Sequence, residues 1–123
     1  MLLTLLVFLQ TKHLLFDFLM QPPWMYKNKG TYGHMGGVAH ALLHGVSTYL
    51  ILSAMDYPFE LCVWVLCAET IAHYHIDWAK MNLNSVMRWG PTTSEWFWRL
   101  LGADQYLHQL TYLAIAAVVT GAS

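Results

Sequence analysis

Long runs of apolar residues alternate with short polar connections along the whole chain. The runs cover residues 1–20, 35–55, 58–80 and 97–122. Each run is close to the ~20 residues that an α-helix needs to cross a hydrocarbon core of ~30 Å. The pattern predicts an all-α fold, an integral membrane four-helix bundle that forms a single domain over residues 1–123.

The connections between the runs carry signals that end and start helices. Pro22 and Pro23 end the first run, because proline lacks an N–H donor and disfavours a helical residue before it. Residues 56–58 form a short turn between the second and third runs. Thr92 and Glu95 have the spacing of a capping box, which predicts the start of the last helix just after them.

Composition and charge support lipid as the solvent. The chain is 57% hydrophobic and only 11% charged, which is unusual for a soluble domain, and its net charge of −1 gives no basis for binding nucleic acid. The lipid bilayer is therefore the expected partner, and whether the chain forms a homo-oligomer stays open. Five of the six Lys and Arg residues lie in or beside the first and third connections: Lys27, Lys29, Lys80, Arg88 and Arg99. Because cytoplasmic loops are enriched in Lys and Arg, we expect these two connections in the cytoplasm and both termini outside a bacterial inner membrane.

Ionisable residues inside the apolar runs follow a regular spacing. Random placement of the His, Asp and Glu residues would give about 1.6 pairs at i,i+4, whereas six occur. Two residues four apart lie on one face of a helix, one turn above the other, so both can point at a common centre. Each predicted helix carries one such pair: His13 with Asp17, His40 with His44, His73 with Asp77, and Asp104 with His108.

Depth in the membrane gives a second, independent regularity. At ~1.5 Å per residue, all four pairs fall ~5–12 Å below the cytoplasmic surface. Imidazole and carboxylate ligands without thiolate favour Zn²⁺, with Fe²⁺ or Mn²⁺ as alternatives. Eight ligands suffice for two metal ions, or for one ion with a hydrogen-bonded surrounding shell. The alternative is a metal-free network of His and Asp side chains that only holds the helices together.

Lys12 and Glu69 are the candidate catalytic residues. Glu69 lies one helical turn deeper than His73, where it would serve as a general base or support a ligand. Lys12 adjoins His13 and would stabilise an oxyanion, offset the carboxylates or extend its amine toward the membrane surface. Together these residues suggest a membrane-embedded, metal-dependent hydrolase of a lipid-like ester, amide or phosphoester, although whether the protein is an enzyme stays open. The alternatives are a metal or proton transport or sensing protein, and a structural or regulatory phage membrane protein.

These residues also carry a resemblance that covers nearly the whole chain. The chain resembles an uncharacterised family of small bacterial and phage integral membrane proteins, known as a domain of unknown function. The resemblance implies the same ligand positions but no activity, and a looser similarity runs to membrane-bound metal-dependent hydrolases. The matching motifs are Lys12-His13 with Asp17-Phe18 and Gln21, Lys27 or Lys29, His40 with His44, His73 with Asp77 and Lys80, and Asp104-Gln105 with His108.

Overall fold

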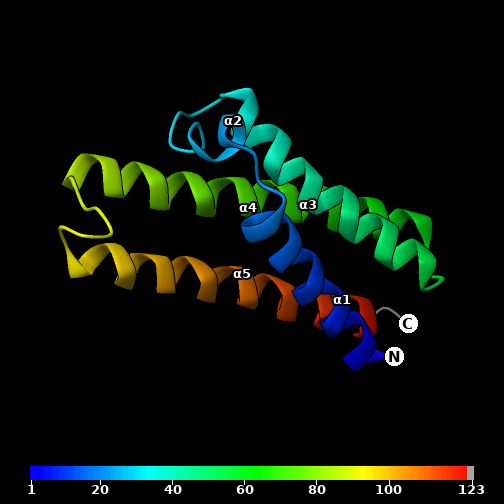
Figure 1. Ribbon diagram of the computed structural model, residues 1–123. Helices are drawn as coiled ribbons and strands as arrows, with labels where there is room; N and C mark the ends of the chain where they lie inside the picture. The colour runs from blue at the N-terminus through cyan, green and yellow to red at the C-terminus, as the bar shows by residue number, and fades with distance from the viewer. Residues whose placement is uncertain (122–123) are drawn as a thin grey trace.

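The computed structural model describes residues 1–121, and these fold into helices joined by short connections. Because α1 continues directly into a π-helical turn, the fold consists of four long rods and one short helix (Figure 1). The all-α prediction is confirmed. The elements are α1 (Leu2–Leu14), the π-helical turn η1 (Leu15–Leu19), α2 (Pro23–Tyr26), α3 (Met35–Ala54), α4 (Phe59–Met87) and α5 (Glu95–Gly121).

The main difference from the expected boundaries is at the end of α4. The sequence predicts an end at residue 80, but the helix continues to Met87, because residues 81–87 contain neither glycine nor proline. It stops where Arg88 adopts a left-handed conformation with φ of 56°, two residues before Gly90. The expected end of the last helix, at residue 122, lies outside the described residues.

The start of α5 differs from the predicted capping box. The hydroxyl of Ser94 accepts a hydrogen bond from the backbone N–H of Trp96 at 3.2 Å, so Ser94 caps the helix that begins at Glu95. Thr92 lies in the preceding turn. The capping box was therefore the wrong motif, although it located the helix start to within two residues.

The long helices form one bundle with both described chain ends on the same side. α4 and α5 run antiparallel, α3 packs along α4, and α1 crosses α3 and α5 (Figure 1). The connection from residue 20 to residue 34, which contains α2, folds against the start of α3. Gly45 allows α3 to approach α4 closely, since a Cβ atom there would overlap the hydroxyl of Thr70.

The interior of the bundle is divided into an apolar half and a polar half. The apolar half is built around Leu5, Leu9, Leu52, Tyr112 and Val119 and lies toward the two chain ends. The other half holds most of the buried ionisable side chains of residues 1–121, contributed by all four long helices and the first connection. The four i,i+4 pairs predicted to share a helical face therefore lie in the interior of the bundle.

The outer surface of the bundle is apolar along the helices. Between residues 61 and 83 of α4, and between residues 100 and 118 of α5, no exposed side chain belongs to Lys, Arg, Asp or Glu, and His75 is the one exposed histidine in these ranges. Two helical segments, Leu2–Leu19 and Met35–Ala54, are long and apolar enough to cross a membrane by length and composition alone. Glu69 and Asp77 of α4 and Asp104 of α5 are buried, whereas the exposed charged residues of these two helices, Glu60, Glu95 and Arg99, lie near the helix ends.

Candidate metal centre

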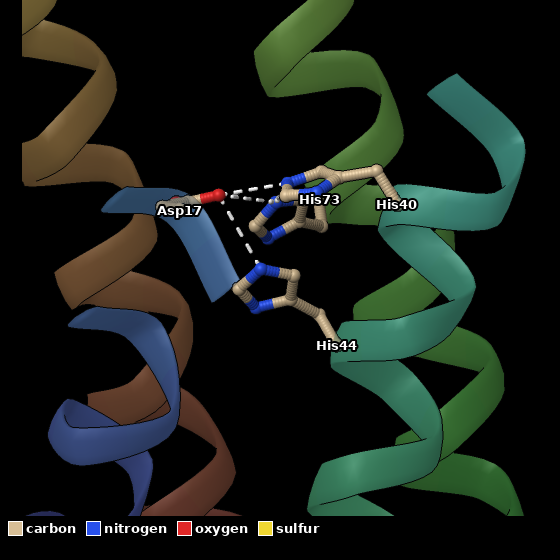
Figure 2. Close-up of side chains that lie close together, drawn as sticks. All are labelled: Asp17, His40, His44 and His73. Carbon is tan, nitrogen blue, oxygen red and sulfur yellow. Dashed lines mark hydrogen bonds and ion pairs between the residues drawn. The ribbon is translucent and has the colours of Figure 1, made fainter. Parts of the chain in front are cut away.

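Four side chains from three separate segments converge in the polar half of the bundle. Asp17 comes from η1, His40 and His44 from successive turns of α3, and His73 from α4 (Figure 2). The carboxylate oxygen Oδ1 of Asp17 faces all three imidazoles, at 2.7 Å from Nε2 of His40, 3.3 Å from Nε2 of His44 and 3.7 Å from Nε2 of His73. The Nε2 atoms of His40 and His73 are 3.0 Å apart.

These spacings match the edges of a tetrahedral metal site. Zn²⁺ bonds of about 2.0–2.2 Å to nitrogen and oxygen, at tetrahedral angles, place neighbouring ligand atoms roughly 3.3 Å apart. The four measured separations, 2.7 to 3.7 Å, lie on both sides of that value. We call Asp17, His40, His44 and His73 the primary cluster.

Hydrogen bonding alone does not account for the primary cluster. Oδ1 of Asp17 is within hydrogen-bond distance of Nε2 of His40 and Nε2 of His44, and Nε2 of His73 faces the same oxygen. A carboxylate oxygen has two lone-pair sites, so three imidazoles that aim Nε2 at the same oxygen are better explained by one ion bound between them. Three imidazoles and one carboxylate fit Zn²⁺, and they also fit Fe²⁺ or Mn²⁺.

A second group of potential metal ligands, His73, Asp77 and His108, lies next to the primary cluster and shares His73 with it. Asp77 lies one helical turn after His73 on α4. Its Oδ2 is 3.4 Å from Nε2 of His73, and its Oδ1 is 3.3 Å from Nε2 of His108. The same Nε2 atom of His73 also faces the primary cluster, and one nitrogen lone pair binds one metal ion. In addition, the Lys29 amine lies 2.6 Å from Oδ2 of Asp77. The arrangement favours one metal ion over the two that the sequence allowed.

His13 lies beside the primary cluster and holds Asp17 in place. Its Nδ1 is 3.1 Å from Oδ2 of Asp17 and 2.9 Å from the hydroxyl of Tyr112, and its Nε2 hydrogen-bonds Oε1 of Gln105 at 2.8 Å. Both ring nitrogens are thus occupied by neighbouring side chains. By holding Oδ2 of Asp17, His13 orients the other carboxylate oxygen, Oδ1, toward the three imidazoles.

Asp104 also lies apart from the two sets of converging ligands. Its Oδ2 accepts hydrogen bonds from Lys80 at 3.1 Å and from the amide of Gln105 at 3.0 Å. Its Oδ1 is 3.6 Å from Nε2 of His108. The two residues of the fourth i,i+4 pair therefore have different partners: His108 lies beside Asp77, and Asp104 pairs with Lys80.

The carboxylates around the primary cluster are balanced by three lysines. Lys12 forms a buried ion pair with Glu69, Lys29 with Asp77, and Lys80 with Asp104. Lys12 is 4% exposed and also donates to the backbone carbonyl of His44 at 3.0 Å, so its amine stays in the core and does not extend toward the surface. Glu69 is 1% exposed and belongs to neither set of converging ligands, so the two candidate catalytic residues are paired with each other.

Lys29 is the site residue that periodicity missed. The sequence placed it among the charges of a surface connection, yet its side chain is 5% exposed and lies 3.7 Å from Oδ1 of Asp17. A connection has no helical period from which an inward residue can be identified, so only the family resemblance, through Lys27 or Lys29, pointed to it. Tyr112 was also missed, although it follows His108 by four residues on the same face of α5.

Protein surrounds the primary cluster on all sides. The imidazoles of His40, His44 and His73 are at most 1% exposed and the Asp17 carboxylate is 6% exposed. Five cavities of 110 to 400 Å³ lie along residues 1–121, and none of these five is lined by a member of the primary cluster. A ligand that reaches the metal position must therefore move a side chain or a helix.

The fold and this site define an all-α protein with buried His and Asp groups able to hold a metal ion. Residues 3–123 match the family described as "Protein of unknown function (DUF3307)", and the chain belongs to that family. No curated protein and no solved structure matches the chain. The family membership confirms the resemblance to a domain of unknown function and brings no activity with it.

Proposed function

We propose that this protein is an integral membrane metalloprotein that binds one divalent ion, Zn²⁺ before Fe²⁺ or Mn²⁺, at the primary cluster. One observation carries the proposal: Oδ1 of Asp17 and the Nε2 atoms of three histidines lie at tetrahedral ligand spacing in the buried interior of the bundle. A metal-free network has no need for three imidazoles to aim Nε2 at one carboxylate oxygen, which has only two lone-pair sites.

The distribution of charge supports the membrane location. Most ionisable side chains within the long helices are buried on the bundle axis, whereas the exposed faces of these helices are mainly apolar over the length of a bilayer, with exposed polar residues that include Gln10, Thr11 and His75. Because hydrophobic side chains cover the outside of the bundle, the composition is 57% hydrophobic although five histidines are buried in the interior. We propose that the connection before α3, residues 20–34, and the connection between α4 and α5, residues 88–94, face the cytoplasm of a bacterial cell. Both termini would then lie outside.

Hydrolysis of a lipid-like ester, amide or phosphoester is the reaction that this site would support once water took the place of one of the four protein ligands or entered as a fifth, since a catalytic metal site needs an open coordination position. A divalent ion bound there would polarise a carbonyl or phosphoryl group and acidify water. Asp77 is the carboxylate best placed to accept the proton, because its Oδ2 lies 3.3 and 3.4 Å from the Nε2 atoms of His40 and His73. Glu69 is less suited to this role than the sequence suggested, since it belongs to neither set of converging ligands, although each carboxylate has a lysine partner.

Transport or sensing is the second candidate for the same site. The apolar half of the bundle, which contains Leu5, Leu9 and Leu52 at 0% exposure, offers no polar route from the primary cluster toward the chain ends. This apolar packing disfavours transport of an ion across the bundle, so sensing is better supported than transport. A structural role is the third candidate, and it predicts loss of stability without metal binding.

Metal content of purified protein tests the proposal directly. We expect about one transition metal ion per chain in wild type by elemental analysis and a stoichiometric decrease in Asp17→Asn and His73→Ala. His75→Ala is the matched control, because His75 lies two residues from His73 on α4 but is exposed. Circular dichroism and size-exclusion chromatography in detergent would verify that Asp17→Asn is folded. Wild type without stoichiometric metal after reconstitution with Zn²⁺, Fe²⁺ and Mn²⁺ would refute the metal site and the hydrolase together.

A further inference from the structure

The outer side of the α4–α5 pair carries two cavities in line with one another. One has a volume of about 110 Å³ and lies between Ala79 and Lys80 of α4 and Ala103 and Asp104 of α5. The other, about 400 Å³, lies nearer the chain ends, and Ala72 is among its lining residues. Lining residues recur every three or four positions along both helices, so the two cavities are parts of one groove, which we call the α4–α5 groove.

The size and position of the α4–α5 groove fit an acyl chain. From Trp64 to Lys80 the groove extends over 16 helical steps, or about 24 Å, which is most of the ~30 Å hydrocarbon thickness. Alanine side chains on both helices, including Ala72 and Ala114, keep it open, and Trp64 and Val118 on its rim are 75% and 55% exposed. In the proposed orientation, the groove opens directly to lipid.

One end of the groove has paired charges that are incompletely satisfied. Lys80 donates to Asp104, and its side chain is 15% exposed, in contrast to 4% for Lys12 and 5% for Lys29. Asp104 is 2% exposed and lines the cavity, and its Oδ1 has no hydrogen-bond partner among residues 1–121. The nearest recorded group, Nε2 of His108, is 3.6 Å from that oxygen and beyond hydrogen-bond distance. This end of the groove therefore offers an ammonium donor and a buried carboxylate acceptor side by side.

A ligand complementary to this pair presents a negative group to Lys80 and an N–H or O–H donor to Asp104. We propose that the α4–α5 groove binds a membrane phospholipid with a phosphoethanolamine headgroup, its phosphate at Lys80, its ammonium at Asp104 and an acyl chain between the helices. The zwitterionic headgroup matches the adjacent positive and negative side chains. A phosphocholine headgroup lacks an N–H donor, and a phosphoglycerol headgroup carries a net negative charge beside Asp104.

The inference rests on the proposed membrane location and names a substrate class for the proposed hydrolase. The amine of Lys80 is 4.0 Å from Oδ1 of Asp77, and Oδ2 of Asp77 is 3.3 Å from Nε2 of His40 in the primary cluster. A phosphate held at Lys80 is thus separated from the metal position by one carboxylate. Lipid binding itself requires no metal, so the two proposals can fail separately.

Lipid competition measured by native mass spectrometry from detergent tests the groove. With matched acyl chains, we expect phosphatidylethanolamine to bind about tenfold more tightly than phosphatidylcholine, since one charge-assisted hydrogen bond contributes about 1.5 kcal/mol or more. Asp104→Asn, which keeps the side-chain shape, should reduce that preference to less than threefold. Ala72→Leu combined with Ala114→Leu should fill the groove and weaken both lipids, whereas Ala117→Leu, an exposed alanine on α5, should leave binding unchanged.

Several results would overturn the inference. Equal binding of the two lipids, stronger binding of phosphatidylglycerol, or normal binding by the groove-filling variant would each exclude the assigned headgroup or position. A wild-type dimer that the groove-filling variant converts to a monomer would show that a second copy of the chain occupies the groove. Zinc content measured on the same samples separates the proposals: lipid binding without metal would refute only the metal site, and metal without lipid preference would refute only the groove.

Discussion

Removal of the Lys12 amine should be among the most damaging single changes to this fold. Lys12→Met leaves the Glu69 carboxylate in a position that is 1% exposed, without its cation. Loss of one partner from a buried ion pair typically destabilises a protein by about 3–5 kcal/mol, and loss of the hydrogen bond to the His44 carbonyl adds about 1 kcal/mol. We therefore expect the free energy of unfolding to decrease by about 4 kcal/mol or more.

The double variant distinguishes a stranded charge from a general packing defect. Lys12→Met combined with Glu69→Gln removes both charges, so the unfolding free energy should return to within about 2 kcal/mol of wild type. Lys27→Met, which removes an exposed lysine, should change it by less than about 0.5 kcal/mol. The assay is reversible unfolding in mixed detergent and SDS micelles followed by circular dichroism. A loss below 1 kcal/mol in Lys12→Met, or simple additivity in the double variant, would refute the reasoning.

Three further predictions concern helix packing, metal binding and topology. Gly45→Ala should destabilise the fold by about 1–3 kcal/mol, because its Cβ would overlap the Thr70 hydroxyl. Gly102→Ala should stabilise the fold by up to about 1 kcal/mol, because a Cβ atom there meets open space. Equal effects of the two substitutions in thermal melts would contradict the close α3–α4 packing. Zn²⁺ at 100 times its dissociation constant should raise the unfolding free energy by about 2.7 kcal/mol in wild type, and a similar gain in Asp17→Asn would argue against the assigned ligands. Alkaline phosphatase fused to the C-terminus should be active and a fused fluorescent protein dark in bacteria, and the opposite result would reverse the proposed topology.

Helical periodicity explains how much of the site could be read from the sequence. The i,i+4 rule places side chains on one face of a helix, and this was enough to find Asp17, His40, His44 and His73 on separate segments. A shared face does not specify which atom reaches a common centre. His13 therefore had the same pattern as the others, although both of its ring nitrogens are held by neighbouring side chains.

Other features depend on contacts that no local pattern encodes. Lys29 enters the core from a connection, and its position depends on how residues 20–34 fold against α3. The π-helical turn at Leu15–Leu19 differs from an α-helix by one residue per turn, too little for a hydrophobic pattern of five residues to reveal. The extra turns of α4 were missed because Asn82 and Asn84 look like connection residues, although Asn84 is buried.

In the proposed membrane location, the three lysine–carboxylate pairs would also constrain the order in which the chain is assembled. Each pair joins two different segments: α1 with α4, the first connection with α4, and α4 with α5. A helix that enters the bilayer alone carries its charges unpaired, at about 2.5–3.5 kcal/mol for each one near the centre. α4, with Glu69, Asp77 and Lys80, bears the largest such penalty, and its last partner, Asp104, is synthesised after it. We therefore expect nascent chains that stop before α5 to be poorly inserted and rapidly degraded, so that stable insertion waits for the last helix to leave the ribosome.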